Sequence, residues 1–208
     1  AATVAHARTV GGPALRALTF QQRGQILKGL SKVIHEHRDE LIEIAGRNGG
    51  NTRGDAKFDL DGASGTLAYY AHLSKELPET PWLTDGAGTQ LGRTARFWSE
   101  HVMLPRPGVA LHINAFNFPA WGMGEKLACS ILAGMPVVSK AGTASGMLAW
   151  RVSQLLVASG LLPEGSFQFL AGSVAKMVDH MQPMDVVAFT GSARTGARIR
   201  SNPACIEN

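Results

Sequence analysis

Four short segments rich in Gly, Ser, Thr and Asn each follow an apolar run, and they carry the residue types best suited to binding chemistry. They are residues 114–119 (NAFNFP), 140–143 (KAGT), 171–173 (AGS) and 190–196 (TGSARTG). Glycine lets backbone approach a phosphate closely, and the N-terminus of a following helix offers free N–H groups and a positive dipole. One such loop usually only turns the chain. Four in succession, one of them with Lys140, favour a nucleotide site.

Other chemistries are less well supported. The fingerprint G-x-G-x-x-G and the phosphate loop G-x-x-x-x-G-K-[ST] are both absent. His35 and His37 stand two apart, on different faces of a helix, so a shared metal is not predicted. Cys129 lies in the apolar run 127–132, where a cysteine is usually a small core residue, and no basic cluster near Cys205 would form a thiolate. His112 is expected to be a buried structural histidine.

The loops lie within a regular alternation of strands and helices. Short apolar runs predict strands, and stretches with helical spacing of apolar residues connect them. This pattern predicts an α/β fold, a Rossmann-like parallel sheet with helices on both faces, in which ligands bind beyond the carboxyl ends of the strands. The expected strands are 109–113, 136–140, 166–170 and 185–189, and the expected helices are 122–132, 145–159, 174–181 and 193–200.

The first half of the chain has a different pattern, with long helices in place of alternating strands and helices. Apolar spacing predicts helix over 13–47, with Thr19 as an N-cap and residues 48–51 (NGGN) as the stop, and again over 56–77. Residues 78–92 resemble a turn-rich connector, and 94–104 are expected to be extended. We therefore divide the chain into a helical part (1–84), a connector with an extended strand (85–106) and a dinucleotide-binding part (107–208).

Composition excludes several classes of protein. The chain has 208 residues, of which 45% are hydrophobic and 17% charged, as in an ordinary globular protein. The net charge is +4, but the basic residues are scattered among acids, so nucleic acid is not an expected partner. No apolar run is long enough for a membrane helix. Two distant cysteines exclude a disulfide framework and suit a cytoplasmic location.

Three segments together resemble the cofactor-binding half of the aldehyde dehydrogenase superfamily. They are residues 109–119, 137–140 (VVSK) and 189–192 (FTGS) with Gly196, in the order and spacing of that family. Residues 66–71 (TLAYYA) resemble the family's helix before its oligomerisation strand. Residues 112–119 and 161–165 (LLPEG) further resemble one branch, the semialdehyde dehydrogenases of aerobic aromatic degradation through CoA thioesters, which includes enzymes of benzoate and phenylacetate breakdown.

The resemblance assigns roles to individual residues. Asn117 matches the asparagine whose amide helps to form an oxyanion hole, Lys140 the lysine at the adenosine ribose, Gly172 the glycine beside adenine and Ser192 the residue near the pyrophosphate. An amide N–H aimed at the developing oxyanion stabilises charge that appears only during reaction. The implied cofactor-binding set is Ile113, Asn114, Ala115, Phe116, Lys140, Thr143, Gly172, Phe189, Thr190, Gly191, Ser192, Thr195 and Gly196.

One departure from the family pattern bears on the cofactor. The family's lysine is commonly followed by Pro-Ser-Glu, and that glutamate holds the ribose hydroxyls in enzymes that prefer NAD. Here Lys140 is followed by Ala141, Gly142 and Thr143. A carboxylate would repel a 2′-phosphate, whereas a threonine can donate a hydrogen bond to it. We therefore expect NADP rather than NAD.

The resemblance implies oxidation of an acyl-CoA semialdehyde, such as 3,4-dehydroadipyl-CoA semialdehyde, to the acid. In the family a cysteine thiolate attacks the aldehyde and a glutamate activates the hydrolytic water. Both lie downstream of the segment that matches 189–192, so we expect them beyond Asn208, in a catalytic domain that this chain lacks. The resemblance also implies a homodimer or homotetramer, with 94–104 as the strand that pairs across subunits.

Two alternatives remain open. The chain is a non-catalytic nucleotide-binding module if no glutamate and cysteine follow at family-like spacing. It belongs to a dehydrogenase of a simple aliphatic aldehyde if the intact protein prefers a free aldehyde to its CoA-linked analogue.

Overall fold

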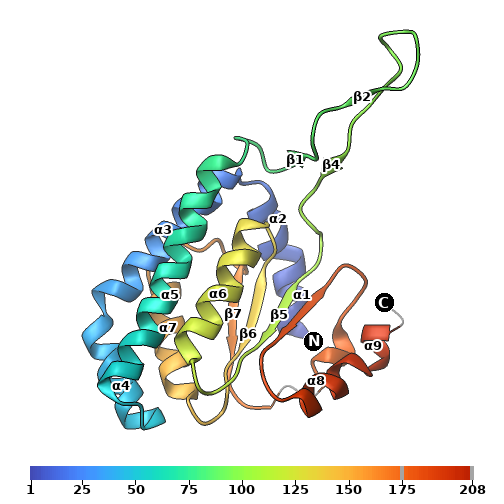
Figure 1. Ribbon diagram of the computed structural model, residues 1–208. Helices are drawn as coiled ribbons and strands as arrows, with labels where there is room; N and C mark the ends of the chain where they lie inside the picture. Colours follow the sequence, from blue (N-terminus) through green and yellow to red (C-terminus); the bar gives the residue numbers. More distant parts are fainter. Residues whose placement is uncertain (174–175, 207–208) are drawn as a thin grey trace.

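The computed structural model describes residues 1–173 and 176–206 and is built around a four-stranded parallel sheet (Figure 1). The spatial order is β7-β6-β5-β8. The first of these strands in the sequence, β5, lies inside the sheet; β6 and β7 follow on one side of it, and β8 lies on the other side. The predicted α/β class is confirmed. The strands are β5 (Ala110–Ile113), β6 (Val137–Lys140), β7 (Phe167–Leu170) and β8 (Val186–Phe189).

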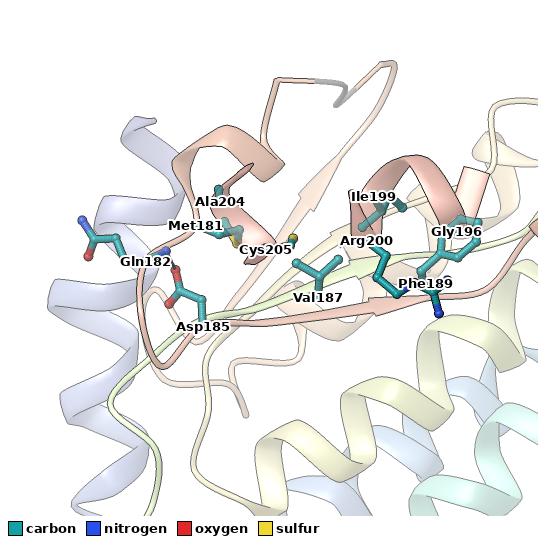
Figure 2. Close-up of a pocket in the computed structure, with 10 residues that line it drawn as sticks. All are labelled: Met181, Gln182, Asp185, Val187, Phe189, Gly196, Ile199, Arg200, Ala204 and Cys205. Carbon is teal, nitrogen blue, oxygen red and sulfur yellow. Dashed lines mark hydrogen bonds between the residues drawn. The ribbon is translucent and has the colours of Figure 1, made fainter. Parts of the chain in front are cut away.

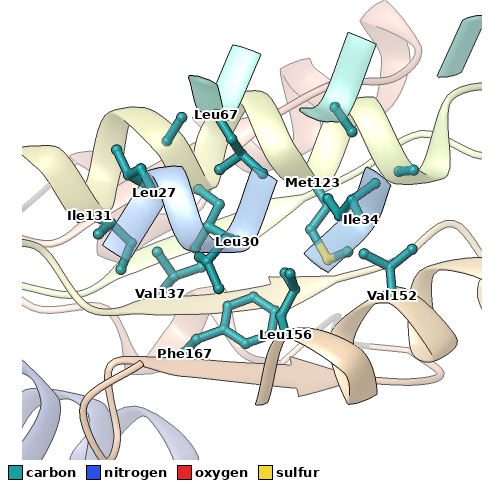
Figure 3. Packing of buried hydrophobic residues seen from close by; sticks show 14 of the residues in the cluster. Leu27, Leu30, Ile34, Leu67, Met123, Ile131, Val137, Val152, Leu156 and Phe167 are labelled. Carbon is teal, nitrogen blue, oxygen red and sulfur yellow. The ribbon is translucent and has the colours of Figure 1, made fainter. Parts of the chain in front are cut away.

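A layer of long helices covers one face of the sheet (Figure 3). Its members are α3 (Phe20–Glu36), α4 (Arg38–Gly49), α5 (Arg53–Leu73), α6 (Pro119–Leu132) and α7 (Gly146–Ala158). Leu30, Leu67, Met123 and Leu156 are all buried and pack with Val137 of the sheet. Burial of each such side chain is worth about 1.5–3 kcal/mol, so this layer supplies most of the core.

Shorter elements cover the opposite face, where the N-terminus lies (Figure 1). Val4, Val178 and Met181 are buried there against Leu111 and Val138. The elements that bury residues there are α1 (Ala2–His6), the π-helical turn η1 (Ala7–Gly11) and the 3-10 helix η3 (Val178–His180). Helix α2 (Gly12–Arg16) instead buries Leu15 in the main core, and α8 (Ala193–Arg200) and α9 (Pro203–Ile206) bury no residue.

The prediction of a helix over 174–181 is wrong for residues 176–181, which the structure describes. Residues 174 and 175 lie outside the described residues, and 176–180 form a turn and the single 3-10 turn η3. Met181 is already extended, with φ −70° and ψ 145°. Val178 and Met181 are buried against the sheet and Met177 is partly buried beside them, so a single turn places these side chains in the core.

The helix predicted over 13–47 is divided into α2, α3 and α4. Thr19 is the N-cap of α3, as predicted, and forms a capping box with Gln22: its Oγ1 accepts from Gln22 N at 3.2 Å, and its own N–H donates to Gln22 Oε1 at 2.8 Å. A second interruption falls at His37, with φ −102° and ψ 15°. Gly50, with φ +68°, ends α4 in the left-handed conformation that favours glycine.

After α5 and the 3-10 turn η2 (Ser74–Glu76), the chain forms a long arm, residues 83–104, that projects away from the sheet (Figure 1). Two antiparallel pairs hold it together: β1 (Leu83–Thr84) with β4 (Val102–Met103), and β2 (Thr89–Gln90) with β3 (Trp98–Ser99). The extended structure expected over 94–104 is therefore limited to two short strands. Among residues 1–173 and 176–206, no helix combines the length and the apolar character needed to cross a membrane.

Candidate functional site: a basic cleft at the strand ends

Predicted site residues meet in one row at the carboxyl end of the sheet. Ile113 is in register with Lys140 on one side and with Phe189 on the other. Backbone hydrogen bonds continue past the last paired residues, from Asn114 N to Lys140 O and from Thr190 N to Ile113 O, each 2.9 Å long. Parallel pairing therefore brings together three segments that are far apart in the sequence.

A cleft of about 380 Å³ opens beside this row, and four predicted residues line it: Ile113, Lys140, Thr143 and Thr195. The other lining residues are Ser173, Val178, Arg198, Ile199 and Asn202. Two cations and several hydroxyl groups thus share the cleft, and no lining residue from the described part of the chain is a carboxylate. Such a lining suits an anion with many acceptor oxygens.

The loops after β5 and β6 contact each other closely. A Cβ on Gly142 would lie 2.7 Å from Phe116 Cα and 2.8 Å from Phe116 N, so only glycine permits this approach. Ser145 Oγ donates to Phe116 O at 2.6 Å. Gly142 therefore serves contact between the two loops, which the sequence pattern alone does not distinguish from contact with a phosphate.

Two polar residues of the β5 segment are structural. His112 is 1% exposed, its Nε2 lies 3.0 Å from Ser130 Oγ, and burial, with a smaller contribution from Lys126, lowers its pKa to about 3. The imidazole therefore stays neutral, as expected for a structural histidine. Asn114 is also buried and donates from Nδ2 to Ser139 Oγ at 3.1 Å, so it supports the loop without lining the cleft.

A second cavity of about 490 Å³ lies between β8 and the helices α8 and α9 (Figure 2). Phe189 and Gly196 line it, together with Val187, Ile199 and Arg200. A Cβ on Gly191 would lie 2.4 Å from the Phe189 ring, which explains glycine at this position. Ile199 is shared with the cleft, so α8 forms the wall between the two.

The remaining predicted residues do not line the cleft. Ser192 is the N-cap of α8 and accepts from Thr195 N at 3.3 Å. Gly172 has φ +90°, which favours glycine, and is exposed. Asn117 is exposed two residues before α6. Ala115 is half-buried, and Phe116, Thr190 and Gly191 are exposed.

Sequence reasoning missed Arg198, Ile199 and Asn202. With Thr195 they follow the spacing of one helical face, which continues from α8 into the turn after it. That periodicity is the signal that identifies them, once Thr195 is assigned to the site.

One expectation about the cysteines is wrong. Cys129 is exposed, because α6 turns Met123, Leu127 and Ala128 toward the core and leaves the next position outside. The neighbouring Cys129 is the main cause that raises the pKa of the Tyr70 hydroxyl to about 12.

The family model for the aldehyde dehydrogenase family matches residues 1–207 of the chain. A 3,4-dehydroadipyl-CoA semialdehyde dehydrogenase from Aromatoleum evansii is 44% identical over 197 residues, which are 95% of this chain and 38% of that protein. An NADP⁺ succinate-semialdehyde dehydrogenase from Escherichia coli is 25% identical over 90% of this chain and 37% of its own length. The chain thus spans less than two fifths of either relative.

The fold agrees with these matches. The crystal structure of a salicylaldehyde dehydrogenase from Pseudomonas putida G7 superposes with a TM-score of 0.83 at 19% identity, covering 99% of this chain and 42% of that one. The matching family model, the 44% identical relative and the shared fold lead to one conclusion: the chain belongs to the aldehyde dehydrogenase family.

Proposed function

We propose that this chain is the cofactor-binding part of an NADP-dependent aldehyde dehydrogenase that oxidises an acyl-CoA semialdehyde to the acid. The observation that carries the cofactor assignment is the cleft with two cations, Lys140 and Arg198, and no carboxylate from the described residues. A 2′-phosphate is a dianion with free acceptor oxygens, and these side chains are the donors it needs.

The residues present fit a dinucleotide. Lys140 and Arg198 would hold the 2′-phosphate, and Thr143 and Thr195 would donate hydrogen bonds to it or to the ribose. The N-terminus of α8, capped by Ser192, would face the pyrophosphate with its positive dipole. When bound, NADP supplies the hydride acceptor for oxidation of the aldehyde carbon.

Asn117 is proposed to act at the aldehyde itself. It lies in the loop between β5 and α6, on the same edge of the sheet as the cleft. Its side-chain amide would donate a hydrogen bond to the oxygen that becomes negative when a nucleophile adds to the carbonyl. The nucleophilic cysteine and the glutamate base belong, in this proposal, to the remainder of the enzyme.

The substrate assignment rests on similarity to one relative. The 44% identical protein is named for 3,4-dehydroadipyl-CoA semialdehyde, and we propose this substrate or a close analogue, within aromatic catabolism. Comparing kcat/KM for a CoA-linked semialdehyde and for its free analogue tests this. Equal values would exclude recognition of the CoA group.

Replacing Thr143 with Glu is expected to reverse the cofactor preference. A carboxylate beside Lys140 would repel the 2′-phosphate and could accept hydrogen bonds from the ribose hydroxyls of NAD, so affinity for NADP should fall by about 10- to 100-fold. Titration calorimetry of the chain with each dinucleotide measures this directly.

The matched control is Thr143→Gln, which adds similar bulk without charge and should keep the preference for NADP. If the unmodified chain binds NAD more tightly than NADP, the cofactor proposal is wrong, whatever the variants do.

We also propose that the arm joins subunits into a homodimer or homotetramer. Its exposed apolar side chains would be covered by another copy. They are Leu91, Phe97, Trp98, Val102, Met103 and Leu104.

The double substitution Val102→Glu and Leu104→Glu is expected to give monomers, because two charges per copy would then meet at the interface. Light scattering coupled to size exclusion measures the mass. The control, Thr89→Glu with Thr94→Glu, adds the same charge at exposed polar positions of the arm and should leave the oligomer intact. A monomeric unmodified protein would contradict the proposal.

A further inference from the structure

Helix α6 begins without a cap from its own sequence. Its N-cap is Phe118, which has no side-chain acceptor, and Pro119 at the first position has no N–H. Gly122 N donates to Phe118 O at 2.9 Å in the ordinary helical pattern. The N–H groups of Ala120 and Trp121 therefore need acceptors from elsewhere, and both residues are partly or fully buried.

Asp59 of α5 supplies both acceptors. Its Oδ2 accepts from Ala120 N at 3.1 Å and its Oδ1 from Trp121 N at 2.7 Å, so one carboxylate spans the first turn of α6 from 61 residues away. The residue is 1% exposed. A negative charge at this position also complements the positive end of the α6 dipole.

The residues around Asp59 hold the same turn. Phe58 makes edge-to-face contacts with Phe118 at 5.9 Å and with Trp121 at 5.2 Å between ring centroids. A Cβ on Gly62 would lie 2.3 Å from the Trp121 ring, so glycine allows α5 to approach α6 closely. The chain segment on either side of Asn117 is thus anchored: Phe116 by Ser145, and Phe118 by α5.

The buried carboxylate costs stability near neutral pH. Burial raises the pKa of Asp59 to about 6, opposed by the two backbone hydrogen bonds. Because this folded-state pKa lies above that of the unfolded chain, near 3.9, the folded state binds the proton more tightly. The stability this group contributes is therefore present below about pH 4 and lost as the pH rises to 6. Stability alone does not favour an aspartate here.

We propose that Asp59 is a positioning residue for the oxyanion-stabilising amide of Asn117, acting through the first turn of α6. This inference rests on the proposed role of Asn117. An asparagine at position 59 could accept only one of the two N–H groups and would turn an NH₂ toward the other. The first turn would shift, and Asn117, two residues ahead of Pro119, would move with it.

The test is a double-mutant cycle in the aldehyde dehydrogenase that carries these residues. Asp59→Asn should lower kcat by about tenfold or more, since small displacements of a catalytic group have large effects, with KM for NADP unchanged. Added to Asn117→Ala it should lower kcat no further, because both act through one amide. The matched control is Asp61→Asn, on the same helix, where the carboxylate is exposed and paired with Arg38; kcat should stay unchanged.

Unchanged kcat in Asp59→Asn overturns the inference, as does a double variant whose loss is the product of the two single losses. If Asn117→Ala itself leaves kcat unchanged, the proposed role of Asn117 fails and this inference with it, which separates the two failures. If Asp59→Asn does not fold, amide exchange in the unmodified chain decides. Protected N–H groups at Ala120 and Trp121 support the anchor, and exchange at the rate of a free amide overturns it.

Discussion

Replacing Asn117 with Ala in the aldehyde dehydrogenase that carries these residues is expected to lower kcat by about 10²- to 10³-fold. In the proposed role, the amide donates to an oxygen that is charged only while the reaction proceeds, so its loss should raise the barrier without weakening cofactor binding. KM for NADP should stay within about twofold. Steady-state kinetics at saturating aldehyde measures both values.

The matched comparison is Lys140→Ala. This change removes a cation from the cleft and should raise KM for NADP while leaving kcat nearly unchanged. A fall in kcat alone for Asn117→Ala and a rise in KM for NADP alone for Lys140→Ala would show that the two residues act on different parts of the reaction. If Asn117→Ala raises only KM, the residue binds the cofactor or the substrate and is not part of an oxyanion hole.

Much of the fold depends on residues that are close together in the sequence, which is why it could be predicted from the sequence. Each strand of the sheet is a short apolar run that ends in a turn, and Thr19 and Gly50 mark helix ends through side-chain capping and positive φ. The errors come from tertiary contacts. Residues 176–181 contain only one turn of 3-10 helix, in which Val178 and the following Met181 pack against the sheet beside Val4 and Ala7.

The sequence predicted the part of the candidate site that depends on the pairing of the strands. Parallel pairing places Ile113, Lys140 and Phe189 in one row, as expected for the carboxyl edge of a sheet. Arg198 was missed because its place in the cleft lining depends on how α8 is oriented beside the cleft. Asp59 could not be found either: nothing within five residues of it indicates that its partners are Ala120 and Trp121.

A second residue that anchors α6 is also far from its partner in the sequence. Arg23 of α3 is 0% exposed, and its Nη1 donates to Leu132 O at 2.7 Å, at the C-terminal end of α6. Asp59 holds the N-terminal end of that helix. A buried carboxylate and a buried guanidinium therefore sit at opposite ends of α6, each with the sign that complements the helix dipole. Together they fix the helix along its axis.

Arg23→Met is expected to lower the free energy of unfolding by about 3–5 kcal/mol, because removing a buried charged donor leaves one buried and two partly buried carbonyl groups without this partner. Besides Leu132 O, the guanidinium donates from Nε to Leu18 O at 3.1 Å and from Nη2 to Pro81 O at 2.9 Å. For a chain of this size the melting temperature should fall by about 10 °C. Circular dichroism of the chain during heating and in urea measures the change.

Two further variants show whether the fork of donors or the charge alone matters. Arg23→Lys keeps the charge but cannot reach three carbonyl groups in different directions, so its loss should be intermediate. Lys28→Met removes a cation from the exposed side of the same helix and should change stability by less than about 0.5 kcal/mol.

Burial lowers the pKa of Arg23 to about 10, so the guanidinium remains charged at neutral pH and its hydrogen bonds are charge-assisted. An Arg23→Met protein as stable as the unmodified one would mean that apolar packing replaces these bonds without loss, and that α6 is held at its N-terminal end alone.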